Sequence, residues 1–424
     1  MTWLIHHRRF KAEDGERFSL LMAGEPAIPL FYPTVYEVEQ RRSRGLASST
    51  IWNDEEALKH LLVWAHTAKI DLYARFEAGE LLVDSEIASY ARAAKEDHRR
   101  LRSRSSGQGR LVAEPSALLK RGREAFRVAS PTAEPTVGMS LEDHRIRTAR
   151  EYLGWLADKT TPTAAVSESA LKARFDRKDE MLRRLKSYEP GHPRGSGSPK
   201  NGLTEDQQTL LLDVVRPDSP RNPWNNPYVR ARNQVLICFF VGLGPRKGET
   251  QKQQVAHVDM YMQQVSIVRN PDAIDDDRRI EPNVKRVGRI LPMEASLSDL
   301  LSDFITLWRS NVPRSEKTDY LFLTVDGKPM SAEAVHKVFR TLREATPELP
   351  QNLSAHLLRH TWNDNYSVTM DKNKVDPANE TRTRSYLMGW RETSGSAARY
   401  TNRSTRRRAN EHSKATQRRI FGKQ

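Results

Sequence analysis

The stretch SAHLLRHTWNDNY (residues 354–366) raises the question of why one predicted helix carries His356, Arg359 and His360 among leucines and a tryptophan. Ionisable groups are rarely buried unless they are paired, so packing alone does not explain them. His356 and Arg359 are spaced i and i+3, which places both side chains on one face of the helix. Taken alone, His356 is more often a satisfied core histidine, so the interpretation of this helix depends on what the rest of the chain supplies.

Composition restricts the partners of the chain. It has 424 residues, a length typical of two to three domains, and a formal net charge of +15. Such an excess favours a polyanion or an acidic surface as partner, although a solvated basic face is the simpler alternative. Cys238 is the single cysteine, which fits a reducing compartment and excludes a disulfide framework. Without an apolar segment of membrane-spanning length or a secretory h-region, we expect a cytoplasmic, nucleoid-associated protein with no membrane contact.

The first half of the chain predicts a helical domain. Residues 1–45 predict an irregular N-terminal extension with one short strand at 18–24. Helical apolar periodicity then predicts a domain over residues 46–188, with helices at 48–69, 81–96, 140–159 and 167–188. A basic Ser/Gly stretch at 97–110 is either a flexible loop or an arm that contacts phosphates. The Pro-, Gly- and Ser-rich residues 189–202 predict the linker between two domains.

The second half predicts more helices and one small antiparallel β-sheet, so the fold class is mainly α. Two β-type runs, 263–269 and 285–293, flank a polar, acidic insert. The remaining segments predict helices at 203–215, 226–244, 295–309, 331–345, 355–370, 381–389 and from about 396. We place the second domain at 203–410 and a basic tail at 411–424.

Chemistry-bearing residues follow one another in an interpretable order. GLGPRKGE places an arginine directly after a buried helix ends at Gly, with Glu249 three residues later to orient the turn. A lysine opens the second β run, HLLRHT follows, and LMGW and AARY come last. The candidate site residues in these segments are Arg246, Lys285, His356, Arg359, Trp390 and Tyr400.

This order resembles the tyrosine recombinase (phage integrase) family, closely over residues 203–410 and more loosely over 46–188. HLLRHT is the most specific piece, and LMGW followed by a tyrosine is the second. The resemblance implies a helical core-binding domain that clamps duplex DNA against a mixed α/β catalytic domain. It implies that the six candidate residues are catalytic and that no metal or other cofactor takes part.

Phosphodiester transfer gives independent reasons for the arginines. Negative charge develops on the non-bridging oxygens, and the guanidiniums of Arg246 and Arg359 can bind them while always charged. Each such donor can contribute roughly 3–4 kcal/mol in a water-poor site. The indole N–H of Trp390 can donate to a phosphate oxygen but cannot exchange protons.

The nucleophile and its acid–base partners follow the same logic. A tyrosine with a free pKa near 10 is a poor nucleophile at pH 7, so Tyr400 needs a base or a cationic field. His356 is the natural candidate for that help, and Lys285 is the natural proton donor to the leaving 5′-oxygen. Tyr366 and Tyr386 precede Trp390, which leaves Tyr400 as the nucleophile and the residue that forms a 3′-phosphotyrosine.

A metal site is the alternative interpretation of the two histidines. His356 and His360 are four residues apart, as metal ligands on a helix are. A zincin-type site needs Glu at the second position of its motif, where Leu357 stands, and no third ligand is evident. We therefore expect no metal.

We expect a site-specific recombinase, the integrase or transposase of a mobile element, that cuts and rejoins double-stranded DNA. The family implies a homo-tetramer on two DNA sites, with accessory recombinases or DNA-bending proteins as further partners. The tail after Tyr400, residues 401–424, would dock into a neighbouring protomer, contact phosphates, or both. A type IB topoisomerase-like activity and a non-catalytic DNA-binding accessory protein are the alternatives.

Overall fold

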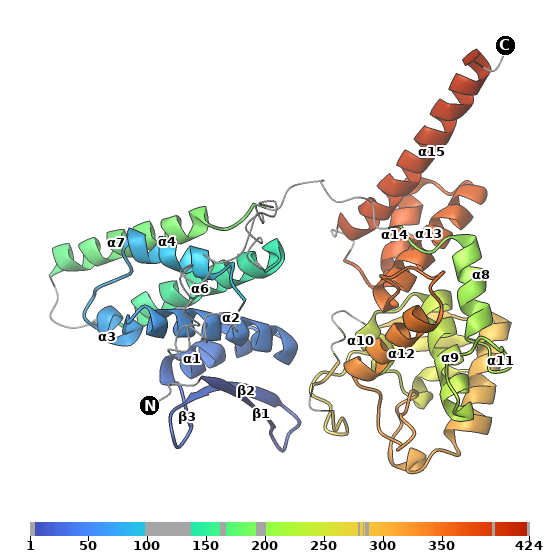
Figure 1. The fold of residues 1–424 in the computed structure, drawn as a ribbon, viewed down its shortest axis with the longest axis horizontal. Coiled ribbons are helices and arrows are strands. Elements are labelled where there is room, and N and C mark those ends of the chain that lie inside the picture. Colours follow the sequence, from blue (N-terminus) through green and yellow to red (C-terminus); the bar gives the residue numbers. More distant parts are fainter. Residues whose placement is uncertain are drawn as a thin grey trace, which may run out of the picture. The chain divides into compact units, whose positions relative to one another are not determined.

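The computed structural model describes residues 5–97, 137–161, 167–191, 201–278, 280–282, 284, 288–391 and 395–421, with only the backbone described at 398, 399, 401–408 and 411. The chain divides into two compact units, Met1–Ala12 with Arg17–Gly195 and Glu13–Glu16 with Ser196–Gln424. Both are mainly helical, and each holds a three-stranded antiparallel sheet (Figure 1). The predicted fold class is confirmed, although the sequence predicted only one of these two sheets.

The first unit consists of a small sheet followed by helices. The predicted helices at 48–69, 81–96, 140–159 and 167–188 are confirmed to within a few residues as α2, α4, α6 and α7. Most of the basic stretch 97–110 and most of the linker 189–202 lie outside the described residues. The elements are β1 (His6–Lys11), β2 (Arg17–Ala23), β3 (Ile28–Pro29), α1 (Phe31–Tyr36), the π-helical η1 (Glu37–Arg42), α2 (Ser48–Thr67), α3 (Leu72–Glu77), α4 (Asp84–Ala93), α6 (Met139–Lys159) and α7 (Glu168–Ser187).

The expectation of an irregular N-terminal extension over residues 1–45 was wrong. β2 corresponds to the predicted strand, but β1 pairs with it in a register that runs from His6 opposite Met22 to Lys11 opposite Arg17. The sequence HHRRFK of β1 shows no apolar alternation, because it contributes mainly backbone hydrogen bonds to a strand whose own apolar side chains face α2. The pairing partner, rather than local hydrophobicity, makes this segment a strand.

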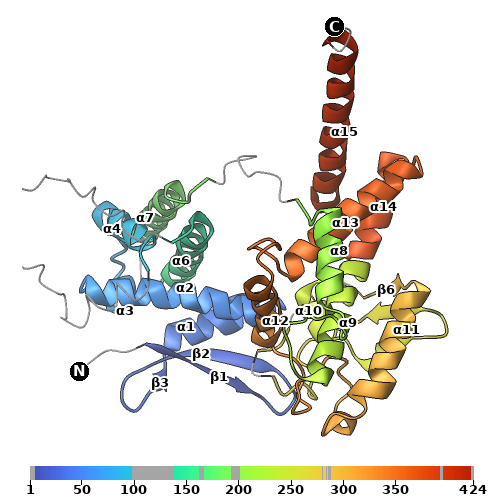
Figure 2. The same cartoon turned by 45° about the vertical axis from the view of Figure 1, so that its right-hand side comes forward.

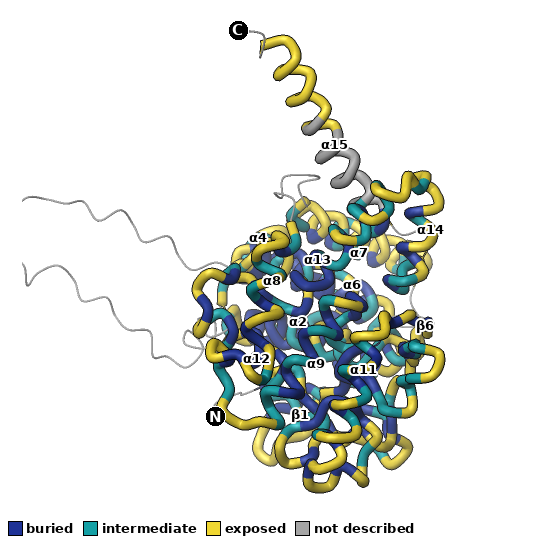
Figure 3. Tube along the Cα trace, turned by 90° about the vertical axis from the view of Figure 1, so that its right-hand side faces the viewer, coloured by how far each residue is buried: buried dark blue, intermediate teal, exposed yellow. Residues whose placement is uncertain are grey.

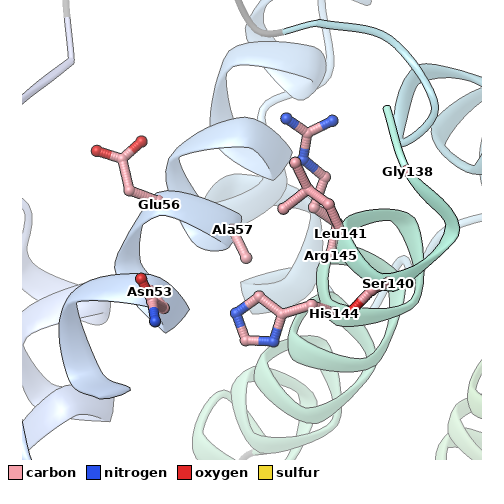
Figure 4. A pocket seen from close by; sticks show the side chains of 8 residues that line it. All are labelled: Asn53, Glu56, Ala57, Gly138, Ser140, Leu141, His144 and Arg145. Atoms are coloured by element: carbon pink, nitrogen blue, oxygen red, sulfur yellow. The ribbon is translucent and has the colours of Figure 1, made fainter. Parts of the chain in front are cut away.

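A cavity of about 590 Å³ lies in the first unit between α2 and α6. Figure 4 shows Asn53 and Glu56 on α2 and His144 and Arg145 on α6 around it. The predicted site residues that the structure describes all belong to the second unit, so none of them lines this cavity.

The second unit places a second sheet among helices (Figure 2). The first predicted β run is confirmed in its central part as β5, and the second in its later part as β6. The elements are α8 (Glu205–Val214), α9 (Pro227–Leu243), α10 (Lys247–Gln251), η3 (Val255–His257), β4 (Val258–Asp259), β5 (Gln264–Ile267), β6 (Arg289–Pro292), α11 (Ala295–Asp303), the π-helical η4 (Phe304–Arg309), η5 (Ser315–Lys317), α12 (Ala332–Ala345), α13 (Ala355–Lys372), α14 (Pro377–Met388) and α15 (Gly395–Phe421).

Helix α9 forms the centre of this unit. Phe239 and Phe240 are fully buried, and the helix packs against α11, α13 and η4. The side chain of Asn226 caps its first turn, and it ends at Gly244, which has a φ of +60°. A Cβ at Gly244 would also lie 2.7 Å from Cγ of Trp362 on α13. Glycine is therefore required there both for its backbone conformation and for the close approach of α13.

The polar insert between the two β runs is part of the folded unit. In its described residues, buried Arg278 binds both carboxylate oxygens of Asp276 at 2.8 Å and donates to a backbone carbonyl of α10. Glu281 is buried against the Lys252 ammonium, which is also buried. These ion pairs give the buried charges of the insert partners of opposite sign.

Helix α15 continues from the predicted nucleophile into the basic tail. It runs without interruption from Gly395 to Phe421, so the predicted boundary at 410/411 is not a break in the helix. Its first turns contact α13 and α14, whereas residues 409, 410 and 412–421 are exposed (Figure 3). Among the helices of the described ranges, none combines the length and apolar character that crossing a bilayer requires.

Lys252→Met should lower the free energy of unfolding by about 3–5 kcal/mol, because Glu281 would remain as a buried charge without its partner. Chemical denaturation of the full chain measures this loss. Arg340→Met is the matched control, since Arg340 and Glu344 form an exposed pair worth less than about 1 kcal/mol. Equal small losses for both variants would contradict a structural role for the buried pair.

Candidate active site

The structure brings five of the six predicted site residues into one cluster in the second unit. Lys285 lies outside the described residues. The other five come from the N-terminus of α10, from α13, from the segment after α14 and from α15. They are linked by contacts described below and comprise Arg246, His356, Arg359, Trp390 and Tyr400.

Glu249 fixes the first arginine at the start of α10. The backbone N–H of Arg246 donates to one carboxylate oxygen of Glu249 at 2.8 Å, and its Nη1 donates to the other at 2.7 Å. The side chain of Glu249 is fully buried, whereas that of Arg246 is partly exposed. The predicted role of Glu249 in orienting this turn agrees with these contacts, which leave the guanidinium accessible at the edge of the cluster.

A third arginine, which the sequence analysis missed, completes the binding of Glu249. Arg289 opens β6, is buried, and binds Glu249 through Nη1 at 3.1 Å and Nη2 at 2.8 Å. Burial alone would raise the pKa of the Glu249 carboxyl, but the hydrogen bonds and charges of Arg289 and the charge of Arg246 lower it to about 2. Glu249 is therefore a fixed negative charge shared by two guanidiniums.

The C-terminus of α14 aligns all three arginines. Three successive backbone carbonyls each accept one guanidinium N–H: Leu387 from Arg289 at 2.7 Å, Met388 from Arg359 at 2.8 Å, and Gly389 from Arg246 at 3.4 Å. Carbonyls in the last turn of a helix lack intrahelical partners and carry the negative end of the helix dipole. The helix end is thus a template that attracts the guanidiniums and sets their spacing.

Gly389 makes this arrangement possible. It has a φ of +58°, and a Cβ built on it would lie 2.8 Å from Nη1 of Arg289. Only glycine accommodates both the left-handed backbone and the close approach of a guanidinium. This explains why the chain reads Met-Gly-Trp immediately before the predicted site residue Trp390.

Unlike Arg246, which is partly exposed, Arg359 is buried. Besides the contact with α14, its Nη1 donates to the carbonyl of Gly244 at 2.7 Å, so it ties the end of α9 to the end of α14. Burial and the nearby charge of Arg246 lower the pKa of its guanidinium. Arg246 and Arg289 share the one carboxylate of Glu249, and Arg359 adds a third cation nearby, so an incoming anion would be stabilised at this cluster.

The phenol of Tyr400 lies between a histidine and the indole. Its Oη is 2.7 Å from Nδ1 of His360, and its ring stacks on that of Trp390 at a centroid distance of 5.5 Å and an interplanar angle of 12°. The guanidinium carbon of Arg359 lies 5.4 Å from the centroid of the Trp390 ring. The indole of Trp390 therefore contacts the phenol ring and lies close to a buried cation.

His360 is a second residue that sequence reasoning missed. It was considered only as a metal ligand, whereas His356 was expected to assist the tyrosine. In the structure Nε2 of His360 is 3.1 Å from Nε2 of His356, so His360 stands between His356 and Tyr400. The available signal was the four-residue spacing, which places both rings on one helix face. Only the position of α15 decides which of the two meets the phenol.

The sequence of the second unit matches a known family. Residues 203–407 match the model of the phage integrase family, a range that contains all six predicted site residues. Residues 203–407 form a phage integrase domain. The resemblance identified from the sequence motifs is thereby confirmed for this part of the chain, and the guanidinium cluster and Tyr400 both belong to the phage integrase domain.

Solved recombinase structures are similar to the chain at low identity. The Tn1549 transposon integrase (residues 82–397) in complex with circular intermediate DNA is 15% identical, with 90% of this chain and 99% of that chain covered and a TM-score of 0.49. The XerA recombinase is 16% identical over 64% and 82% of the chains, with a TM-score of 0.37. The XerH site-specific recombinase bound to difH substrate is 16% identical over 62% and 80%, with a TM-score of 0.36. No curated protein sequence matches the chain significantly.

Glu249→Gln should remove a pH-dependent part of the stability. In the folded protein the carboxylate resists protonation down to about pH 2, whereas in the unfolded chain it takes up a proton near its ordinary pKa of 4.5. The stabilisation is therefore complete above about pH 5 and is lost as the pH falls toward 2, by roughly 3 kcal/mol.

Denaturant unfolding of wild type and variant between pH 6 and pH 2 measures this contribution. The difference in the free energy of unfolding should be largest at pH 6 and should shrink as the pH falls. A difference that stays constant over this range would contradict the proposed environment of Glu249.

Proposed function

We propose that this protein is a site-specific DNA recombinase of the integrase or transposase type, which cuts and rejoins DNA through a 3′-phosphotyrosine intermediate. One observation carries the proposal: within a phage integrase domain, the phenol of Tyr400 lies in the same cluster as the guanidiniums of Arg246 and Arg359. A tyrosine beside fixed cations is suited to attack a bound phosphodiester.

The arginines would bind the scissile phosphate. Arg246 and Arg359 are held by backbone carbonyls and by Glu249 before DNA arrives, so little reorganisation accompanies the reaction. Their charges would neutralise the oxygens that become more negative as the tyrosine attacks. The indole of Trp390 would keep the phenol oriented from the opposite side.

The proposed step exchanges one ester for another. The phenolic oxygen forms a bond to phosphorus, the bond to the 5′-oxygen breaks, and the leaving oxygen takes a proton from Lys285. The position of Lys285 in the sequence motif, before β6, supports this assignment. Because the phosphotyrosine keeps the energy of the broken ester, a 5′-hydroxyl of another strand can reverse the step without metal or ATP.

We propose double-stranded DNA as the partner and a homo-tetramer on two DNA sites as the working assembly. The net charge of +15 supports a polyanionic partner. The exposed end of α15 carries Lys414, Arg418 and Arg419, which would contact phosphates or a neighbouring protomer. The helical first unit would supply the second half of a clamp around the duplex.

Tyr400→Phe should abolish covalent capture of DNA, because phenylalanine lacks the attacking oxygen. The probe is a pool of nicked suicide duplexes tiled across the DNA that flanks the gene, and the readout is a protein–DNA adduct on a denaturing gel. Tyr386→Phe is the matched control, since Tyr386 is exposed on α14 and should retain the adduct.

An adduct that persists with Tyr400→Phe would contradict the assignment of the nucleophile. Wild-type protein that forms no adduct with any duplex of the pool would contradict the proposed function. Relaxation of supercoiled plasmid without recombination would instead favour a type IB topoisomerase-like activity.

Arg359→Lys should slow single-turnover formation of the adduct by about 10²–10³-fold. A lysine cannot hold the carbonyls of Gly244 and Met388 in the geometry of the guanidinium while also facing a phosphate. Arg340→Lys, at an exposed position of α12, is the control, because it makes the same substitution outside the candidate site. Wild-type rates for Arg359→Lys would show that this guanidinium does not stabilise the transition state.

A further inference from the structure

The phenol of Tyr400 is the first member of a hydrogen-bonded chain. Its Oη lies 2.7 Å from Nδ1 of His360, and Nε2 of that ring lies 3.1 Å from Nε2 of His356. The two imidazole rings meet edge to face, with centroids 4.4 Å apart and an interplanar angle of 73°. Three proton-exchanging groups therefore stand in line from α15 into one face of α13.

We propose that His360 is the general base that takes the proton of Tyr400, and that His356 positions His360 for this task. The inference rests on the proposed function, because it concerns the attacking tyrosine of that reaction. It reassigns the proton transfer from His356, which the sequence motif suggested, to the neighbouring histidine that the phenol contacts.

The tautomers that this hydrogen-bonded series of Tyr400, His360 and His356 requires are consistent with one another. Nδ1 of His360 can accept from the phenol only if its proton is on Nε2, and that N–H then donates to Nε2 of His356. If Nδ1 of His360 instead carried the proton and donated it in a hydrogen bond to the phenolic oxygen, His360 could not accept the proton that Tyr400 must lose. His356 thus selects the tautomer of His360 in which Nδ1 faces Tyr400 as an acceptor.

The step balances in protons and bonds. As the phenolic oxygen bonds to phosphorus, its O–H bond breaks and an N–H bond forms at Nδ1 of His360. The leaving 5′-oxygen takes its proton from Lys285, so the site as a whole gains none. During rejoining, His360 returns its proton to the phenolic oxygen as the bond to phosphorus breaks.

The surroundings favour a transient rather than a lasting imidazolium. In the part of the chain that the structure describes, the charged and titratable groups near the pair include His356 and Arg359 on α13, Arg384 on α14 and Tyr400 itself on α15. The guanidinium carbon of buried Arg384 lies 5.7 Å from the centroid of the Tyr400 ring. These cations stabilise a developing phenolate and oppose lasting protonation of His360.

His360→Asn tests the proposal, because the asparagine carbonyl can accept a hydrogen bond near the place of Nδ1 but cannot take the proton. The measurement is the single-turnover rate of adduct formation with the tiled nicked duplexes between pH 6 and pH 9.5. We expect a loss of about 10²–10³-fold at pH 7 that shrinks as the pH rises, because hydroxide then supplies the phenolate. His257→Asn, on η3, is the control and should leave the rate unchanged.

Replacing Tyr400 by 3-fluorotyrosine, whose phenol is more acidic, gives a second test that does not depend on the folding of His360→Asn. In otherwise unchanged protein the acidic limb of the pH–rate profile should stay in place, because the ionisation of the base sets it. If the acidic limb instead shifts to lower pH because the fluorinated phenol has a lower pKa, no base acts on the phenol.

The outcomes separate the two proposals. Wild-type protein without an adduct overturns both the function and the role of His360. An adduct with the wild type, together with a His360→Asn loss that is absent or equal at every pH, overturns the general base and leaves the recombinase function standing.

Discussion

The end of α14 is the constraint on which the rest of the site depends. Three successive carbonyls, those of residues 387–389, accept hydrogen bonds from three guanidiniums that come from α10, β6 and α13. Glu249 supplies the single carboxylate that two of them share. Like charges at this density repel one another, so the helix end and the carboxylate must hold them together. The cluster is thereby set before any phosphate arrives.

The same helix end connects this cluster to the phenol. Trp390 follows the glycine that ends α14, and its ring lies near the guanidinium of Arg359 and stacks on the ring of Tyr400. Helix α15 packs on both α13 and α14, which brings the phenol to His360. A movement of α15 would separate the phenol from His360 without disturbing the guanidiniums. In the proposed reaction, phosphate binding and supply of the nucleophile would therefore be separable.

The sequence predicted those parts of the molecule that local patterns determine. Apolar periodicity placed the long helices, and the order of the motifs identified the arginines, the histidine, the tryptophan and Tyr400. These patterns did not predict β1, because its polar sequence forms a strand only by pairing with β2. Arg289 could not be distinguished from an ordinary strand residue, because Glu249, which it contacts, lies 40 positions earlier in the sequence. The choice between His356 and His360 depends on the packing of α15, which no local pattern encodes.

The central claim is that this cationic cluster directs the phenol of Tyr400 to a backbone phosphate. Mass spectrometry of the trapped adduct, after nuclease and trypsin digestion, tests it most directly because it locates the covalent bond. Cleavage after Arg399 and Arg403 isolates the tetrapeptide YTNR, and fragmentation distinguishes Tyr400 from Thr401 within it. We expect a nucleotide attached to the tyrosine oxygen of that peptide. A nucleotide on any other residue would contradict it.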